Sequence, residues 1–303
     1  MFLLIQAIVL GLLQGLTEFL PVSSSGHLQA VPYLFGWGSG GLTFDVLVHA
    51  GTLVAVIWFF RTDLAALFTR SFGLGDHTTR ERRQARKMVV LLAIASVPAA
   101  LAGLLFGDIF EAAFSSPRAV AGFLYLTGVL LWVAERVRRK RLAHAQVPVE
   151  RAQSTSAGSD EGTLKGDELG RGEGSLRVRD AVTIGTAQAL AIFPGISRSG
   201  ATIATGMVLG LSRTAAARFA FLLAIPIVAG ATVYTLISPP EPSPDTLPFG
   251  PVEIAAGVLA ATLSGYWAVK TMLALVARRD LLGFAKYVTA FATVLFAATF
   301  ILE

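Results

Sequence analysis

A polar stretch lies inside an apolar N-terminal segment, and it returns once in the second half of the chain. The first copy covers residues 14–27, and the second begins at Gln188 and aligns with the first without a gap. Polar side chains in hydrocarbon are costly unless they have partners, so a buried cluster of them predicts a functional site. Residue types are shared at Gln14/Gln188, Leu16/Leu190, Phe19/Phe193, Ser23/Ser197, Ser25/Ser199 and Gly26/Gly200. We interpret the stretch as one structural element that is used twice.

The two copies differ in the side chains that carry chemistry. Glu18, Ser24 and His27 of the first copy are replaced in the second by Ile192, Arg198 and Ala201. Each copy is broken by a proline, which ends a helix, next to serines and a glycine that form a turn. The halves on either side of Pro21 are too short and too polar to span a bilayer comfortably. The pattern therefore predicts a re-entrant helix-turn-helix pair over residues 1–35 and another over 181–210.

Composition places these pairs in a membrane protein. The chain of 303 residues is 54% hydrophobic and 15% charged, whereas soluble chains carry about 25% charged residues. We predict an all-α polytopic membrane protein, and nucleic acid is not expected as a partner because the net charge of +5 is concentrated in loops. Six apolar runs approach the ~20 residues that a membrane helix needs. They cover residues 44–60, 88–107, 118–135, 214–237, 252–277 and 286–302.

Charged loops predict how these helices are oriented. Three basic loops follow the first, third and fifth spans, while residues 238–250 contain no Lys or Arg. The positive-inside rule places the basic loops in the cytoplasm and residues 238–250 outside. Each re-entrant pair is followed by three spans, so the second copy enters upside down and the fold is an inverted-topology repeat. We divide the chain into a first repeat (1–144), a disordered cytoplasmic linker (145–176) and a second repeat (177–303).

Inversion brings the two polar turns together near the middle of the membrane, with Glu18, Ser24 and His27 facing Arg198. Carboxylate and imidazole suit acid–base catalysis, and Glu18 is also a candidate metal ligand. A serine beside a base can be a nucleophile, and Ser24 is our candidate, whereas Ser25 can simply cap the next helix. A purely structural role for Glu18 and His27 stays open at this point.

Arg198 is the clearest sign of an anionic ligand. A guanidinium matches phosphate oxygens through two parallel hydrogen bonds, although a structural salt bridge to Glu18 is the alternative. Neighbouring hydroxyl and backbone groups add further donors, from Ser197, Ser199, Gly200 and Thr202. Asp45 and His49 share one face of a predicted helix, where structural pairing is at least as good an explanation as catalysis.

Both motifs together resemble the undecaprenyl-diphosphate phosphatase family, bacterial membrane enzymes linked to bacitracin resistance. The first motif reads Gln14 to His27, the second reads Pro194 to Thr202, and Phe44 to Thr52 is also similar to the family. The resemblance implies removal of the terminal phosphate of undecaprenyl diphosphate, which recycles the lipid carrier for cell-wall synthesis. It also implies support by Mg²⁺ or Ca²⁺.

The resemblance implies a set of site residues as well. Catalysis falls to Glu18, Ser24, His27 and Arg198, and substrate binding to Gln14, Ser23, Ser25, Ser197, Ser199, Gly200 and Thr202. Gln14 is uncharged, so no metal or proton role is assigned to it. We expect a bacterial plasma membrane enzyme whose site faces the periplasm or exterior, and a homodimer is left open.

Two rival functions fit parts of the pattern. A secondary transporter or flippase of a polyprenyl-phosphate lipid would use the same inverted repeats. Another class of membrane lipid phosphatases uses two histidines with a Lys–Arg motif, but the second histidine is missing after Ser197-Arg198.

Overall fold

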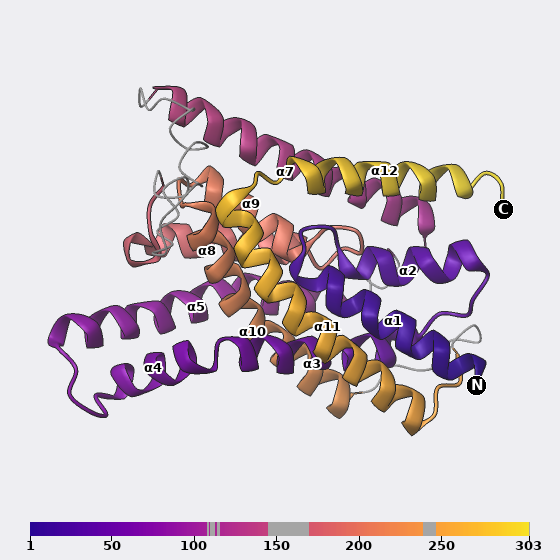
Figure 1. Cartoon of the computed structure of the whole chain (residues 1–303), viewed down its shortest axis with the longest axis horizontal. Coiled ribbons are helices and arrows are strands. Elements are labelled where there is room, and N and C mark those ends of the chain that lie inside the picture. Colours follow the sequence, from indigo (N-terminus) through magenta and orange to yellow (C-terminus); the bar gives the residue numbers. More distant parts are fainter. Residues whose placement is uncertain (108, 110–112, 114–115, 145–169, 239–246, 303) are drawn as a thin grey trace, which may run out of the picture.

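The computed structural model describes residues 1–107, 109, 113, 116–144, 170–238 and 247–302, and this part of the chain is a bundle of helices (Figure 1). Within it the one β-bridge joins Arg171 to Leu211. In chain order the helices are α1 (Phe2–Phe19), α2 (Ser24–Phe35), α3 (Gly41–Phe59), α4 (Arg61–Phe72), α5 (Thr79–Leu105), α7 (Pro117–His144), η2 (Glu173–Ser175), α8 (Val178–Leu190), α9 (Arg198–Val208), α10 (Arg213–Ile237), α11 (Pro251–Arg278) and α12 (Leu282–Ala298).

Six of the described helices are long and apolar enough to cross a membrane, so the predicted all-α membrane fold is confirmed. These six helices are not the same six that the sequence predicted. Helix α1 has the required length and hydropathy, although its polar residues led us to expect half of a re-entrant pair. Helix α12 was predicted as a full span, but it has 17 residues and falls short. The re-entrant path of α1–α2 and α8–α9 stays a prediction.

Each of these pairs is broken by a capped turn. Helix α1 ends at Phe19, before Pro21, and the Ser23 hydroxyl caps α2 by accepting a hydrogen bond from the Gly26 amide at 3.2 Å. Ser197 caps α9 in the same way, with its hydroxyl 3.0 Å from the Gly200 amide. A cap of this kind satisfies a backbone donor that the helix start leaves free. The sequence suggested Ser25 as the cap of α2, but the structure shows that the cap is Ser23.

The first basic loop is a helical hairpin, which corrects the prediction of a plain loop. Helix α4 follows α3 almost directly, and α5 begins at Thr79 with a capping box in which Thr78 and Glu81 exchange hydrogen bonds. Charged residues were interpreted as a loop because they interrupt the apolar pattern. A helix at a membrane surface carries such charges readily, since its length is set by backbone hydrogen bonds and not by apolar content.

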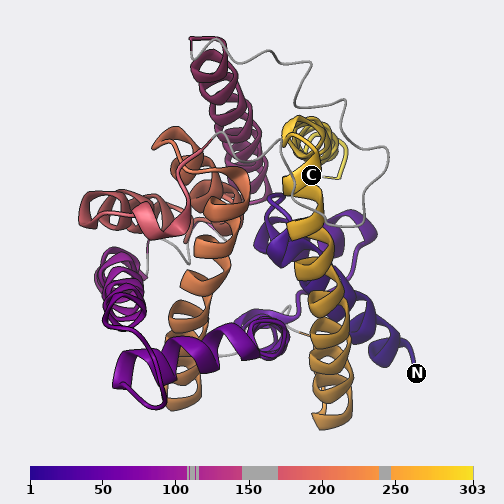
Figure 2. The ribbon, with the colours of Figure 1, turned by 60° about the vertical axis from the view of Figure 1, so that its left-hand side comes forward.

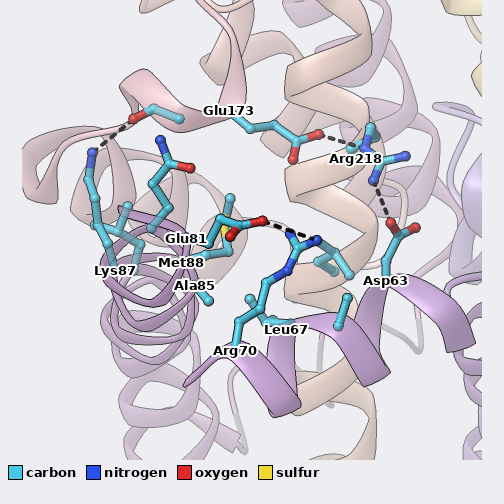
Figure 3. A pocket seen from close by; sticks show the side chains of 14 residues that line it. Asp63, Leu67, Arg70, Glu81, Ala85, Lys87, Met88, Glu173 and Arg218 are labelled. Carbon is cyan, nitrogen blue, oxygen red and sulfur yellow. Dashed lines mark hydrogen bonds and ion pairs between the residues drawn. The ribbon is translucent and has the colours of Figure 1, made fainter. Parts of the chain in front are cut away.

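Residues 170–176, the last part of the predicted linker, are among the described residues and contact the helices of the second half. Leu176 is fully buried, and the Glu173 carboxylate lies 2.7 Å from Nε of Arg218. Arg218 also lies 3.3 Å from Asp63 of α4, so it pairs within the protein (Figure 3). A charged cavity of about 290 Å³ lies between α4, α5, η2 and α10. Residues 145–169 lie outside the described residues.

Helices of one half pack on helices of the other in a repeated pattern (Figure 2). Helix α1 packs against α11, and α8, which aligns with α1, packs against α5. Glycines make both contacts close: a Cβ at Gly11 would lie 2.2 Å from the Gly257 carbonyl, and one at Gly185 would lie 2.3 Å from the Ala95 carbonyl. Gly11 and Gly185 occupy equivalent positions of the two copies. Small residues let membrane helices approach in this way.

Candidate active site

The two polar turns touch each other at the centre of the bundle. The Ser199 hydroxyl donates to the Leu20 carbonyl at 3.1 Å, which ties the start of α9 to the turn after α1. A Cβ on Gly26 would lie 3.2 Å from Cα of Gly195, so the backbones approach as closely as side-chain-free residues permit. Thr127 of α7 accepts from the Ser197 amide and donates to the Gly195 carbonyl, both at 2.9 Å. These contacts fix the second turn against the first.

Glu18 is the centre of the polar cluster that results. Its Oε1 pairs with the guanidinium of Arg198, which confirms that residues 180 positions apart meet, as the inverted repeat predicted. Its Oε2 accepts from the Ser24 hydroxyl at 2.6 Å and from the Gln14 amide at 3.0 Å. The Nε2 atom of His49 lies 3.4 Å from the same oxygen. A buried carboxylate is thus matched by a cation and by hydrogen-bond donors, as burial of a charge requires.

This cluster lines a cavity of about 610 Å³. Glu18, Ser24 and Arg198 line it together with apolar side chains of three other helices. Apolar lining residues of α3, α5 and α10 include Leu42, Val46, Ala99, Leu104, Ile227 and Val228, and the turn after α8 adds Ala191, Ile192 and Ile196. A cavity with a small polar end and a long apolar wall suits an amphipathic ligand, with an anionic head at Arg198 and a hydrocarbon tail along the wall.

The structure divides the predicted binding residues into two groups. Ser23, Ser25 and Ser197 line the cavity. The others lie behind it: Gln14 holds Glu18, Ser199 holds the first turn, Gly200 gives its amide to the cap, and Thr202 donates to the Arg198 carbonyl at 2.8 Å. The second group positions the residues of the first group. Sequence spacing could not separate them, because it does not show which side of a short turn faces the cavity.

His27 lies apart from the cluster, which corrects its predicted place beside Arg198. Its Nδ1 lies 2.7 Å from the Ser23 carbonyl and its Nε2 lies 2.9 Å from the hydroxyl of Tyr287 on α12. The ring stacks on Phe291, with centroids 4.2 Å apart, and it does not line the cavity. Both ring nitrogens are therefore used to fix the start of α2 against α12.

Three residues of the cavity were not predicted as site residues. His49 contacts Glu18, and Asp45, one turn earlier on α3, lines the same cavity. Their spacing on one helix face was visible in the sequence, but nothing there showed that α3 would pass Glu18. Gln188 also lines the cavity, and its alignment with Gln14 was the signal that could have identified it.

A divalent cation fits these residues only when phosphate oxygens complete its shell. Among the described residues no group of three His, Cys, Asp or Glu side chains is close enough to hold a metal alone. Asp45 makes no side-chain hydrogen bond or ion pair within the described part of the chain, and its carboxylate shares the cavity with Glu18. Mg²⁺ is commonly held by one or two carboxylates together with substrate phosphates, and this donor set matches that mode.

Comparison with known proteins gives one consistent result. The family model described as "Bacitracin resistance protein BacA" matches residues 7–294. A protein of Gemmatimonas aurantiaca named undecaprenyl-diphosphatase is 37% identical over 96% of this chain and 96% of its own length. Proteins with the same name from Syntrophotalea carbinolica and Rubrobacter xylanophilus are 41% and 40% identical, covering 93% and 97% of this chain and 94% and 97% of their own lengths. Because the family model matches nearly the whole chain, the chain belongs to the bacitracin resistance protein BacA family.

Proposed function

We propose that this protein is a membrane phosphatase that hydrolyses undecaprenyl diphosphate to undecaprenyl phosphate and inorganic phosphate. Relatives that share more than nine-tenths of its length carry the name undecaprenyl-diphosphatase. One observation carries the proposal from the structure: Ser24 and Arg198 converge on the same carboxylate at the polar end of a cavity with apolar walls. A hydroxyl, a base and a guanidinium are the groups that phosphoryl transfer needs.

Arg198 is the residue that binds the diphosphate. Within the described part of the chain Glu18 is its ion-pair partner, through a single guanidinium nitrogen, and Arg198 also lines the cavity, where its remaining N–H groups would donate to phosphate oxygens. Hydrogen bonds between guanidinium and phosphate are charge-assisted and come in parallel pairs. Charge that builds up on the transferring phosphoryl group is stabilised by such a fixed cation more than by water.

Ser24 is the proposed nucleophile, with Glu18 as its base. The 2.6 Å separation of the Ser24 hydroxyl and Glu18 Oε2 is within proton-transfer reach. In the first step the hydroxyl oxygen bonds to the terminal phosphorus, its proton passes to Glu18, and the bond to the bridging oxygen breaks, releasing undecaprenyl phosphate. Glu18 loses this proton to solvent. In the second step water attacks the phosphoserine, Glu18 relays a proton from water to the serine oxygen, and inorganic phosphate leaves.

Direct attack by water is the competing route, in which Glu18 activates the water and Ser24 only orients it. The same distances permit this route, so the variant Ser24→Ala decides between the two. His27 serves neither route as a base, since both its nitrogens are bonded to Ser23 and Tyr287. It positions Ser24 through the turn.

Mg²⁺ or Ca²⁺ is proposed as the cofactor, held by Asp45 and Glu18 with the phosphates. When bound, the cation would neutralise charge on the diphosphate. Loss of Asp45 should therefore shift the cation concentration needed for half-maximal activity without removing Arg198 from the site.

We also propose that the cavity opens toward the outer face of a bacterial plasma membrane. Basic residues gather at the beginning of α5 and at the ends of α7 and α11, which the positive-inside rule places in the cytoplasm. The cavity instead reaches Leu104 near the end of α5 and Tyr234 near the end of α10, at the other ends of these helices. The homodimer stays a prediction, which the mass of the protein in detergent would check.

Phosphate release from undecaprenyl diphosphate by purified protein in detergent tests the function. Detergent has no compartments, so a transporter or flippase would release nothing, whereas a phosphatase turns over. We expect activity that needs Mg²⁺ or Ca²⁺ and that is abolished by chelation. Wild-type protein that releases no phosphate with either cation would overturn the proposal.

A further inference from the structure

Gln188 is a buried glutamine that lines the cavity of Glu18 and Arg198. It lies on α8, 2% exposed, and within the described part of the chain neither its Nε2 nor its Oε1 has a hydrogen-bond partner. A buried polar atom without a partner destabilises the folded protein, so an amide with both polar atoms in this state needs an explanation. This cost indicates that the amide serves a ligand.

The repeat explains why this amide is free. Gln14, its counterpart in the first copy, donates to Glu18, which lies four residues later on the same helix face. Four residues after Gln188 the second copy has Ile192, which offers no acceptor. The same side chain is therefore engaged by the protein in α1 and left without a partner, beside the cavity, in α8.

We propose that Gln188 is a further binding residue for the diphosphate head group, donating from Nε2 to a phosphate oxygen in the cavity that it lines together with Ser24 and Arg198. This inference rests on the proposed function and extends it. An amide offers two donors and an acceptor, so Oε1 can also accept from a protonated phosphate oxygen or from water. Arg198 supplies charge, and Gln188 supplies a neutral, directional contact from another helix, which fixes the orientation of the head group.

Gln188→Leu tests the assignment, because leucine fills similar space without polar atoms. We expect the KM for undecaprenyl diphosphate to rise roughly ten- to a hundredfold, the effect of losing one hydrogen bond to a charged group. The inhibition constant of inorganic pyrophosphate should rise by the same factor. Thermal stability should stay equal or increase, since an unpaired buried amide has been removed. Gln188→Glu should raise the KM and the inhibition constant of pyrophosphate further, because the new carboxylate would repel the negatively charged phosphate.

Gln6→Leu is the matched control. Gln6 is also 2% exposed and its Oε1 has no hydrogen-bond partner among the described residues, but it does not line the cavity. We expect its KM and pyrophosphate inhibition to match wild type. Equal constants for Gln188→Leu and wild type would overturn the proposal, and so would a KM that rises while pyrophosphate inhibition is unchanged, because the contact would then be with the hydrocarbon chain.

Calorimetric binding of pyrophosphate keeps the two proposals separable. If wild-type protein releases no phosphate, the proposed function fails, yet weaker pyrophosphate binding by Gln188→Leu would still support the anion contact. If wild-type protein turns over and Gln188→Leu binds pyrophosphate as well as Gln6→Leu, only the assignment of Gln188 fails.

Discussion

The turn after α1 and the turn after α8 have the same scaffold and different chemistry. In both, a serine caps the next helix and lies near a second serine hydroxyl, at 3.3 Å between Ser23 and Ser25 and 3.2 Å between Ser197 and Ser199. The residue that follows each cap is Ser24 in one copy and Arg198 in the other, and both line the cavity. The repeat thus keeps the residues that build the turn and changes the residue that the turn presents.

Backbone conformation separates the two turns as well. Ser23 has φ of 71° and is the one described residue other than glycine with positive φ, whereas its counterpart Ser197 has φ of −68°. The second turn places its positive φ on Gly195, at 101°. A left-handed serine costs energy that glycine does not. Strain is therefore held in the turn that carries Ser24, and the turn that carries Arg198 is relaxed.

The largest expected effect comes from removing the group that the first turn presents. Ser24→Ala should lower kcat by roughly 10⁴-fold if the hydroxyl is the nucleophile, because nucleophile and base act as a unit. Ser24→Cys keeps a nucleophilic atom and should retain an intermediate rate. Phosphate release in detergent measures both. A Ser24→Ala rate near that of wild type would show that water is the nucleophile. Both turns would then supply only groups that bind or orient the substrate.

The second-largest effect is expected from removing Arg198, the residue that follows the cap of the second turn. Arg198→Ala should lower kcat/KM by roughly 10³-fold, since a fixed cation is lost from the transition state. Arg198→Lys should recover only part, because lysine cannot form the paired hydrogen bonds of a guanidinium. Arg218→Ala, which disturbs the ion pairs of Figure 3, is the control with unchanged kcat/KM. A full recovery by lysine would show that charge alone is needed.

A third effect concerns stability and compares the two backbones. Gly195→Ala should destabilise the protein by about 1–3 kcal/mol, because φ is positive and the new Cβ would lie 2.5 Å from the Val120 carbonyl. Ser23→Gly should leave the melting temperature nearly unchanged, since glycine accepts the left-handed conformation and loses only part of a cap. Thermal unfolding in detergent compares them. Equal losses would mean that Ser23 is not strained.

The smallest effect is expected at His27, whose counterpart is Ala201. His27→Phe keeps the stack on Phe291 but loses the hydrogen bonds to Ser23 and Tyr287. We expect kcat to fall less than about tenfold, as for a small displacement of Ser24, with the pH profile of kcat unchanged in shape. A profile that loses its acidic limb would restore His27 as a catalytic base.

Much of this arrangement could be predicted from the sequence, because apolar runs and an exact register of two copies are properties of the chain itself. The meeting of Glu18 and Arg198 followed from inversion and needed no side-chain detail. The direction of His27 depends on Tyr287 and Phe291, which are distant in sequence, and so it could not be foreseen. Helix α4 was missed because charge was interpreted as a loop, and His49 because no pattern shows which helices become neighbours.

The glycine contacts of α1 with α11 and of α8 with α5 have a consequence for how the chain is held together. The first helix of each half packs against a helix of the other half. A methyl group added at Gly11 or Gly185 would meet a backbone carbonyl of the opposite half, and no change of side chain there can remove that oxygen. Each position therefore admits only glycine unless the two halves move apart.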